Sequence, residues 1–125
     1  MHTLTTDTLV ALLRRRAAGS YADEAAVELL IAHATWLGRR DFLTTCVDYD
    51  HDGHHPVVWV DWHAVPGFLD RAPCSASEAR ILRLAAELSG IDTGTPLADL
   101  LCGLDDRNRG LVVDAIRHAL QVVGR

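Results

Sequence analysis

Three carboxylates recur at alternate positions ahead of a glycine in the middle of the chain, in the segment Asp48-x-Asp50-x-Asp52-Gly53. This spacing matches the start of an EF-hand calcium loop, in which carboxylate oxygens surround a hard cation. The last position of such a loop requires a glutamate that binds with both oxygens, and Trp59 stands there instead. Because strands are expected on both sides, we favour a polar hairpin turn and keep the three aspartates as candidate metal ligands.

Histidine is concentrated around the same segment, where His51, His54, His55 and His63 lie within thirteen residues. Imidazole groups bind transition metals, so this cluster is a conceivable metal site. Zinc sites with a clear sequence signal divide their ligands between two groups of close spacing, and the cluster has no second group. We therefore interpret the histidines as residues without a metal role and predict no cofactor.

No motif of nucleophilic or phosphate-transfer chemistry occurs in the sequence. Asp61 and His63 share one face at the end of a predicted strand, where a local salt link or cap accounts for them. His33 interrupts the apolar sector of a predicted helix, and we favour a hydrogen-bonded core histidine. Asp114 and His118 lie four residues apart on the last predicted helix and are expected to form an exposed pair. We therefore predict no catalytic residue.

The charge balance argues against broad nucleic-acid binding. The net charge is −5, and all twelve basic residues are arginine, whereas affinity for nucleic acids comes largely from basic side chains that neutralise phosphates. Two groups of arginines, Arg14–Arg16 and Arg107 with Arg109, keep a nucleic-acid-associated regulator as an alternative. Three successive helical residues spread over about 300° of helix surface, so the first group forms no single stripe.

Length and composition indicate one compact domain spanning residues 1–125, with 49% hydrophobic and 23% charged residues. No apolar run approaches the roughly 18 residues that cross a bilayer, and no basic segment leads into an apolar stretch at the N-terminus. We therefore expect a cytoplasmic protein without a membrane partner. Cys46, Cys74 and Cys102 are expected to be buried or half-buried free thiols.

Hydrophobic periodicity predicts two helices and a hairpin in the N-terminal half of the chain. Apolar residues at helical spacing predict helices over residues 6–17 and from Ser20 to about residue 37. The period changes to two from Leu43, which predicts a strand, a turn over residues 50–56 and a partner strand over residues 57–62.

The C-terminal half is predicted to be helical. A short turn follows around Pro66, and Ser75 with Glu78 forms a capping box for a helix to about residue 88. Pro96 opens a further turn, and Asp105 or Asp106 opens the last helix, whose apolar residues are Val112, Ala115, Ile116, Ala119 and Val123. The predicted fold class is α+β, mostly α, with five or six helices packed around one central β-hairpin.

The second predicted strand is apolar on both faces. Val58, Val60 and Trp62 form one face, and Val57 and Trp59 lie on the other beside Asp61. A two-stranded sheet is marginal by itself, so this second face needs a cover. The sequence leaves open whether helices of the same chain or another protein copy cover it, and Val57 and Trp59 are the candidate interface residues.

The C-terminal half resembles small uncharacterised proteins of high-GC actinomycetes. The resemblance rests on the runs SASEARILRLAA (residues 75–86), PLADLL (residues 96–101) and GLDDRN (residues 103–108). The absence of lysine and the single asparagine, Asn108, also suggest a high-GC genome. The resemblance implies a source and no activity.

Together these patterns favour a non-enzymatic protein-interaction domain, an accessory or regulatory factor that self-associates through the hairpin and adjacent helix surfaces. Its expected partner is another protein or a second copy in a homodimer. A small metal-binding protein that uses the three aspartates and a nucleic-acid-associated regulator are the alternatives. The sequence identifies no small-molecule ligand.

Overall fold

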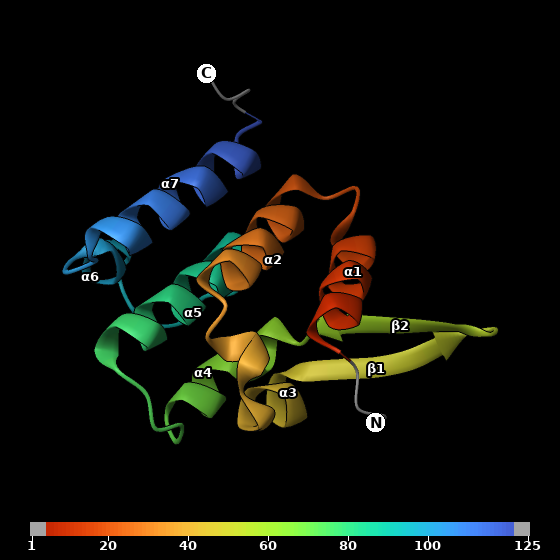
Figure 1. Cartoon of the computed structure of the whole chain (residues 1–125). Coiled ribbons are helices and arrows are strands. Elements are labelled where there is room, and N and C mark those ends of the chain that lie inside the picture. The colour runs from red at the N-terminus through yellow and green to blue at the C-terminus, as the bar shows by residue number, and fades with distance from the viewer. Residues whose placement is uncertain (1–4, 122–125) are drawn as a thin grey trace.

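The computed structural model of the chain describes residues 5–121. Within them the regular elements are helices and one antiparallel hairpin, so the fold is α+β and mostly α, as the sequence predicts (Figure 1). No described helix is long and apolar enough to cross a bilayer. The elements are α1 (Thr6–Ala17), α2 (Tyr21–His33), a 3₁₀ turn (Trp36–Gly38), α3 (Arg40–Cys46), β1 (Val47–Asp52), β2 (His55–Val60), a 3₁₀ turn (Trp62–Ala64), α4 (Val65–Leu69), α5 (Ala76–Leu88), α6 (Leu97–Leu101) and α7 (Asp106–Ala119).

Side-chain caps place three helix starts close to where the sequence predicts them. The side chain of Ser20 accepts a hydrogen bond from the backbone of Asp23 at the start of α2. Ser75 and Glu78 form the predicted capping box of α5, with reciprocal bonds of 2.9 and 3.1 Å. Asp105 caps α7 in the same manner. These contacts satisfy backbone N–H groups that have no partner inside a helix.

The end of α2 was predicted four residues too late. The helix ends at His33 because Ala34 adopts a left-handed backbone with φ of 74°. The apolar pattern nevertheless continues, because the following 3₁₀ turn returns Trp36 and Leu37 to the core, where both are buried. An apolar pattern records which residues are buried, so a 3₁₀ turn that buries two apolar residues gives the same pattern as another turn of α-helix.

Helix α3 replaces the start of the predicted first strand. The alternation from Leu43 predicted a strand, whereas residues 40–46 form a helix that buries Phe42 and Cys46. Those two residues are four apart and lie on one helical face. The described residues therefore contain seven α-helices, one of them in a segment predicted as strand.

The turn of the hairpin is tighter than predicted, and both strands lie closer to it than the prediction placed them. Val47 pairs with Val60 at its base and Asp52 with His55 at its tip, so the turn is Gly53-His54 alone. Gly53 has φ of +65°, and His54 is not among the residues with positive φ, a combination found in type II′ turns, whose twist suits a hairpin. The hairpin lies at one side of the helices, and its tip projects from them (Figure 1).

One part of the core joins α1, the hairpin, α3 and α4. Trp36, Phe42 and Phe68 meet there with ring centroids 5.7 to 5.9 Å apart. The indole Nε1 of Trp36 donates to the carbonyl of Glu78 at 3.1 Å, which ties the aromatic cluster to α5. Val58 and Val60 of β2 are buried in the same cluster, so the predicted inner face of the hairpin is confirmed.

The other part of the core lies among α2, α5, α6 and α7. α2 packs against both α5 and α7 and separates them from α1 (Figure 1). The residues buried here come from all four helices and the turn before α7: Leu29, Ile81, Leu84, Ala85, Leu100, Leu104, Val112 and Ala115.

The three cysteines are free and differ in exposure. Cys46 is buried and Cys74 half-buried, as expected, but Cys102 is exposed after α6, so its prediction was wrong. Burial raises the pKa of the Cys46 thiol to about 12, because the apolar surroundings disfavour the thiolate.

We expect the cysteines to react in the order of their exposure. At pH 8 a disulfide reagent such as Ellman's should modify Cys102 rapidly and leave Cys46 unmodified until the protein unfolds, because the thiolate is the reactive form. The absorbance of the released thionitrobenzoate measures the rates. The fast phase should disappear in Cys102→Ser; a fast phase that disappears in Cys46→Ser instead would contradict the structure.

His33 is buried at the end of α2, as predicted, but the predicted hydrogen bond of its ring is not found among the described residues. The Nδ1 atom has no partner within the described residues, and neither has the side-chain oxygen of the buried Asn108. Burial lowers the pKa of His33, and the positive charge of Arg107 lowers it further. The native state therefore favours the neutral imidazole.

This burial makes stability depend on pH. As pH falls below the unfolded-state pKa of about 6.5, the unfolded chain binds a proton that native His33 resists, so the free energy of unfolding decreases. Denaturant titrations from about pH 7 to about pH 5 should show this loss. His33→Gln should flatten the dependence, while the same change at exposed His63 should not; equal slopes in all three proteins would refute the assignment.

Candidate functional site

The three candidate metal ligands lie along β1 and not in a loop. Asp48, Asp50 and Asp52 alternate along the strand, and all three are exposed. Two residues of a strand span about 6.6 Å, so the first and third carboxylates start about 13 Å apart, whereas calcium requires oxygens within about 2.6 Å. Among the described residues, no group of three or more His, Cys, Asp or Glu side chains is placed to hold a metal ion.

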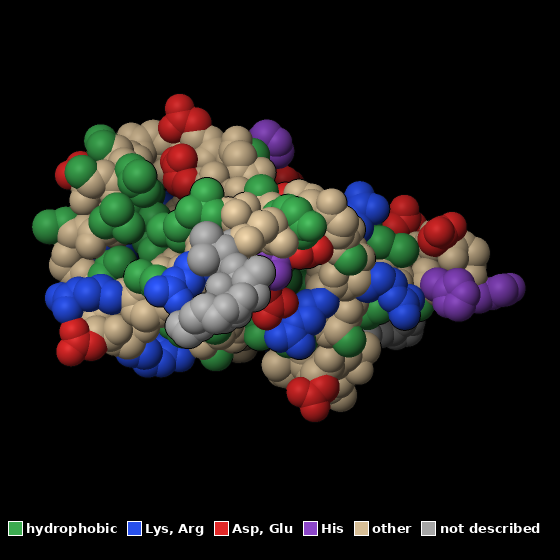
Figure 2. Space-filling model, turned by 90° about the horizontal axis from the view of Figure 1, so that it is seen from above, with side chains coloured by type: hydrophobic (Ala, Val, Ile, Leu, Met, Phe, Trp, Pro, Cys, Tyr) green, Lys and Arg blue, Asp and Glu red, His purple; other side chains and the backbone are tan. Residues whose placement is uncertain are grey.

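The hairpin tip is a polar projection. Acidic and histidine side chains gather at its end in the space-filling view (Figure 2). Tyr49 and His51 contact each other there, with a 2.8 Å bond between the phenol oxygen and Nε2. The turn residues Gly53 and His54 are exposed.

The candidate interface residues of β2 are each half-buried. Val57 and Trp59 lie on the face opposite Val58, and α1 packs along β2. The guanidinium of Arg16 lies 5.3 Å from the centre of the Trp59 ring, a cation–π contact. Helix α1 thus covers part of the face formed by Val57 and Trp59. The sequence alone did not show what covers this face, and Trp59 stays partly exposed beside Arg16.

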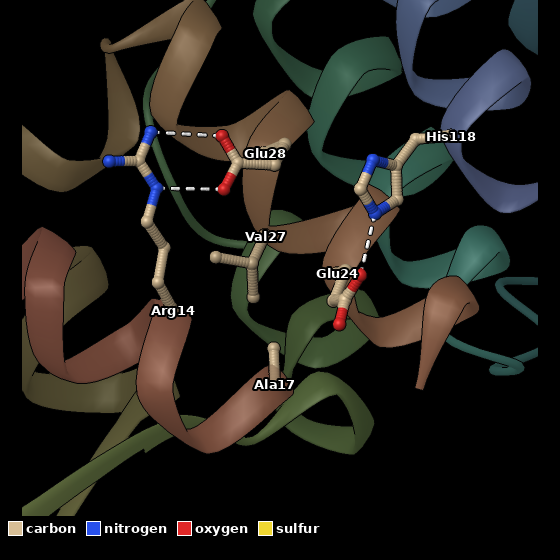
Figure 3. Close-up of a pocket in the computed structure, with 6 residues that line it drawn as sticks. All are labelled: Arg14, Ala17, Glu24, Val27, Glu28 and His118. Atoms are coloured by element: carbon tan, nitrogen blue, oxygen red, sulfur yellow. Dashed lines mark hydrogen bonds and ion pairs between the residues drawn. The ribbon is translucent and has the colours of Figure 1, made fainter. Parts of the chain in front are cut away.

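A hollow of about 390 Å³ lies where α1, α2 and α7 meet. Figure 3 shows two polar pairs at its walls, with Arg14 reaching from α1 to Glu28 and His118 reaching from α7 to Glu24. Arg14 binds both oxygens of Glu28, at 2.8 and 2.9 Å. The His118 Nε2 lies 2.7 Å from a Glu24 oxygen. His118 therefore joins α7 to α2, and the predicted pairing with Asp114 was wrong.

The His118–Glu24 pair has the geometry of a carboxylate that orients an imidazole. The hydrogen bond from His118 lowers the pKa of Glu24, and a second bond from the backbone N–H of Gly19, at 2.9 Å, lowers it further. Hydrolytic sites of this kind add a nucleophile beside the imidazole. The hollow is lined by Arg14, Ala17, Glu24, Val27, Glu28 and His118, none of which carries a hydroxyl or thiol. The pair joins two helices, and the ring of Tyr21 packs edge-on against His118 with centroids 6.5 Å apart.

Four of the five arginines considered for nucleic-acid binding contact other groups of the chain, and the fifth, Arg15, is exposed. The four contacts are to four different partners. Arg14 pairs with Glu28, Arg16 lies over Trp59, Arg107 donates to the carbonyl of Ala32, and Arg109 pairs with Asp106.

The outward side of α6 and α7 carries a group of exposed apolar side chains that sequence reasoning missed. We call them the α6–α7 patch, and Figure 2 shows hydrophobic side chains gathered on that side of the molecule. The members and their exposed fractions are Leu97 (60%), Leu101 (41%), Val113 (47%), Ile116 (38%) and Leu120 (68%).

A signal for this patch is present in the sequence. Val113, Ile116 and Leu120 follow a spacing of three and four, which places them on one helical face. Val112 and Ala115 are buried and lie on the neighbouring face, with Ile116 at the border between the two. The predicted apolar residues of this helix include Ile116 but neither Val113 nor Leu120; Val123, which the prediction also named, lies outside the described residues.

Comparison of the chain with protein-family models, curated proteins and solved structures finds no match. Function therefore has to be inferred from the geometry of this chain. The surfaces with distinct character are the polar hairpin tip, the charged hollow and the α6–α7 patch.

Proposed function

We propose that this protein is a non-enzymatic protein-interaction domain that self-associates and acts as an accessory or regulatory factor. The observation that carries the proposal is the α6–α7 patch. Single exposed hydrophobic residues are ordinary on a protein surface, but a group of them on one side of the molecule is typical of an interaction site. Five of the six large hydrophobic side chains that are exposed among the described residues belong to this patch.

The charged hollow gives little support for a catalytic function. In the hollow, both carboxylates are bound by an arginine or an imidazole of the same chain, and no side chain that lines it carries a hydroxyl or thiol. Enzyme sites collect groups whose hydrogen bonds are completed by the substrate. Here Glu24 and Glu28 already have partners that hold three helices together, which is a structural use of charge.

The hairpin face of Val57 and Trp59 is a second candidate surface for the same function. Tryptophan is common at the energetic centre of interfaces because it offers a large apolar area with a polar edge. Arg16 covers part of the ring in this chain. A partner that binds there has to displace or share that arginine, whereas the α6–α7 patch is open already.

Native mass spectrometry and sedimentation velocity of the full chain test the proposal. We expect the mass to rise from 13.7 kDa towards that of a dimer as concentration increases from about 1 µM to about 1 mM. The same measurement with added calcium reports on the alternative role of Asp48, Asp50 and Asp52. A mass of one chain at every concentration would show that the protein does not self-associate, and a bound calcium ion would favour the metal-binding alternative.

A further inference from the structure

We infer that the α6–α7 patch binds a second copy of this chain, with the two α7 helices packed antiparallel about a two-fold axis. This inference rests on the proposed function and names its partner and surface. It is argued from the order of residues along the outward side of α7, where a glycine, an apolar residue and two opposite charges lie in one row.

The row consists of Asp106, Gly110, Val113 and Arg117. Their spacing of four, three and four places them on one side of the helix, and all four are exposed. Ile116 and Leu120 lie beside the row and widen it into an apolar face. The opposite side of α7 packs against α2 and α5, so the row points away from the body of the protein.

Gly110 is unexplained by the fold of a single chain. Glycine in a helix interior is less stable than alanine, because it loses more backbone freedom on folding. A Cβ built at Gly110 meets no atom within 4 Å, so nothing in one chain excludes a larger residue. The missing side chain does leave a shallow gap in the outward face, into which a partner side chain fits.

The charges select an antiparallel arrangement. Asp106 and Arg117 stand at opposite ends of the row, about 16 Å apart along the helix axis. A two-fold axis that passes midway between Gly110 and Val113 places Asp106 of each copy level with the partner's Arg117 and Gly110 level with the partner's Val113. In a parallel pair, Asp106 would lie beside the partner's Asp106 and Arg117 beside the partner's Arg117, and both contacts are repulsive.

The neighbouring contacts are compatible with this pairing. Arg117 forms no ion pair with another described residue, and the pair between Asp106 and Arg109 is exposed and therefore weak. Asp106 can accept from both arginines. The pairing covers the α7 part of the patch, with Val113 in the row and Ile116 and Leu120 beside it.

Val113→Glu tests the surface. It places a carboxylate at the centre of the contact, and we expect the dimer dissociation constant to rise about a hundredfold, measured by sedimentation equilibrium. The control is Trp59→Ala, which should leave the constant unchanged. Gly110→Gln is a second variant, because it favours the helix while filling the gap; it should weaken the dimer without lowering the melting temperature of the monomer.

Charge reversal tests the orientation. Asp106→Arg and Arg117→Asp should each weaken the dimer about tenfold, since each creates two repulsive contacts, and the double variant should restore it. An equimolar mixture of the two single variants should also restore the dimer, because opposite charges then meet at both contacts. If neither the double variant nor the mixture restores the dimer, the antiparallel pairing is wrong.

The outcomes separate the two proposals. A monomeric wild-type protein would overturn both the self-association and this interface. A dimer that withstands Val113→Glu and dissociates in Trp59→Ala would retain the proposed function and move the interface to the hairpin. A dimer that dissociates in Val113→Glu and follows the charge-reversal pattern supports the interface as stated.

Discussion

The rest of the structure depends on the burial of α2, which has neighbours on nearly every side. Ala25, Ala26, Leu29 and Leu30 are almost entirely inaccessible to solvent, and the helix packs against α1, α5 and α7. Small alanine side chains allow neighbouring helices to approach closely, while the leucines fill the space between them. Removal of apolar surface from water on this scale is the main source of stability in a small domain.

The same constraint determines where charge is placed. A helix with so little exposed surface has room for few polar residues, and Glu24 and Glu28 lie four apart at its border with α1 and α7. Each carboxylate binds a side chain from a different neighbouring helix, Arg14 on one side and His118 on the other. The hollow that resembles a site in shape is therefore a junction of three helices whose charges are already matched.

Much of the fold could be read from local signals in the sequence. Ser75 with Glu78 specified the start of α5, because a capping box is decided by residues three apart. The segment around Phe42 could not be read in this way, since two apolar residues four apart compete with an alternating pattern and only the aromatic contacts with Trp36 and Phe68 decide between them. Tertiary packing outweighs local preference in such short segments.

The functional surface was harder to predict for a related reason. The outward side of α7 carries Val113 and Leu120 among charged residues, and the sequence alone does not show which apolar residues of the helix stay exposed. Which of them the body of the protein covers depends on α2 and α5, which are distant in sequence. For Trp59 the sequence leaves open a cover that the structure supplies. The strand pattern alone does not show that Arg16 of α1 lies over its ring.

The alternating aspartates of β1 acquire another meaning from their place in the hairpin. Within the described residues β1 pairs only with β2, so its far edge presents backbone groups to which a strand of another molecule could add. Such an addition by an identical chain would bring rows of carboxylates together, and their mutual repulsion disfavours it. Asp48, Asp50 and Asp52 thus disfavour edge-to-edge addition of identical hairpins at the open side of β1.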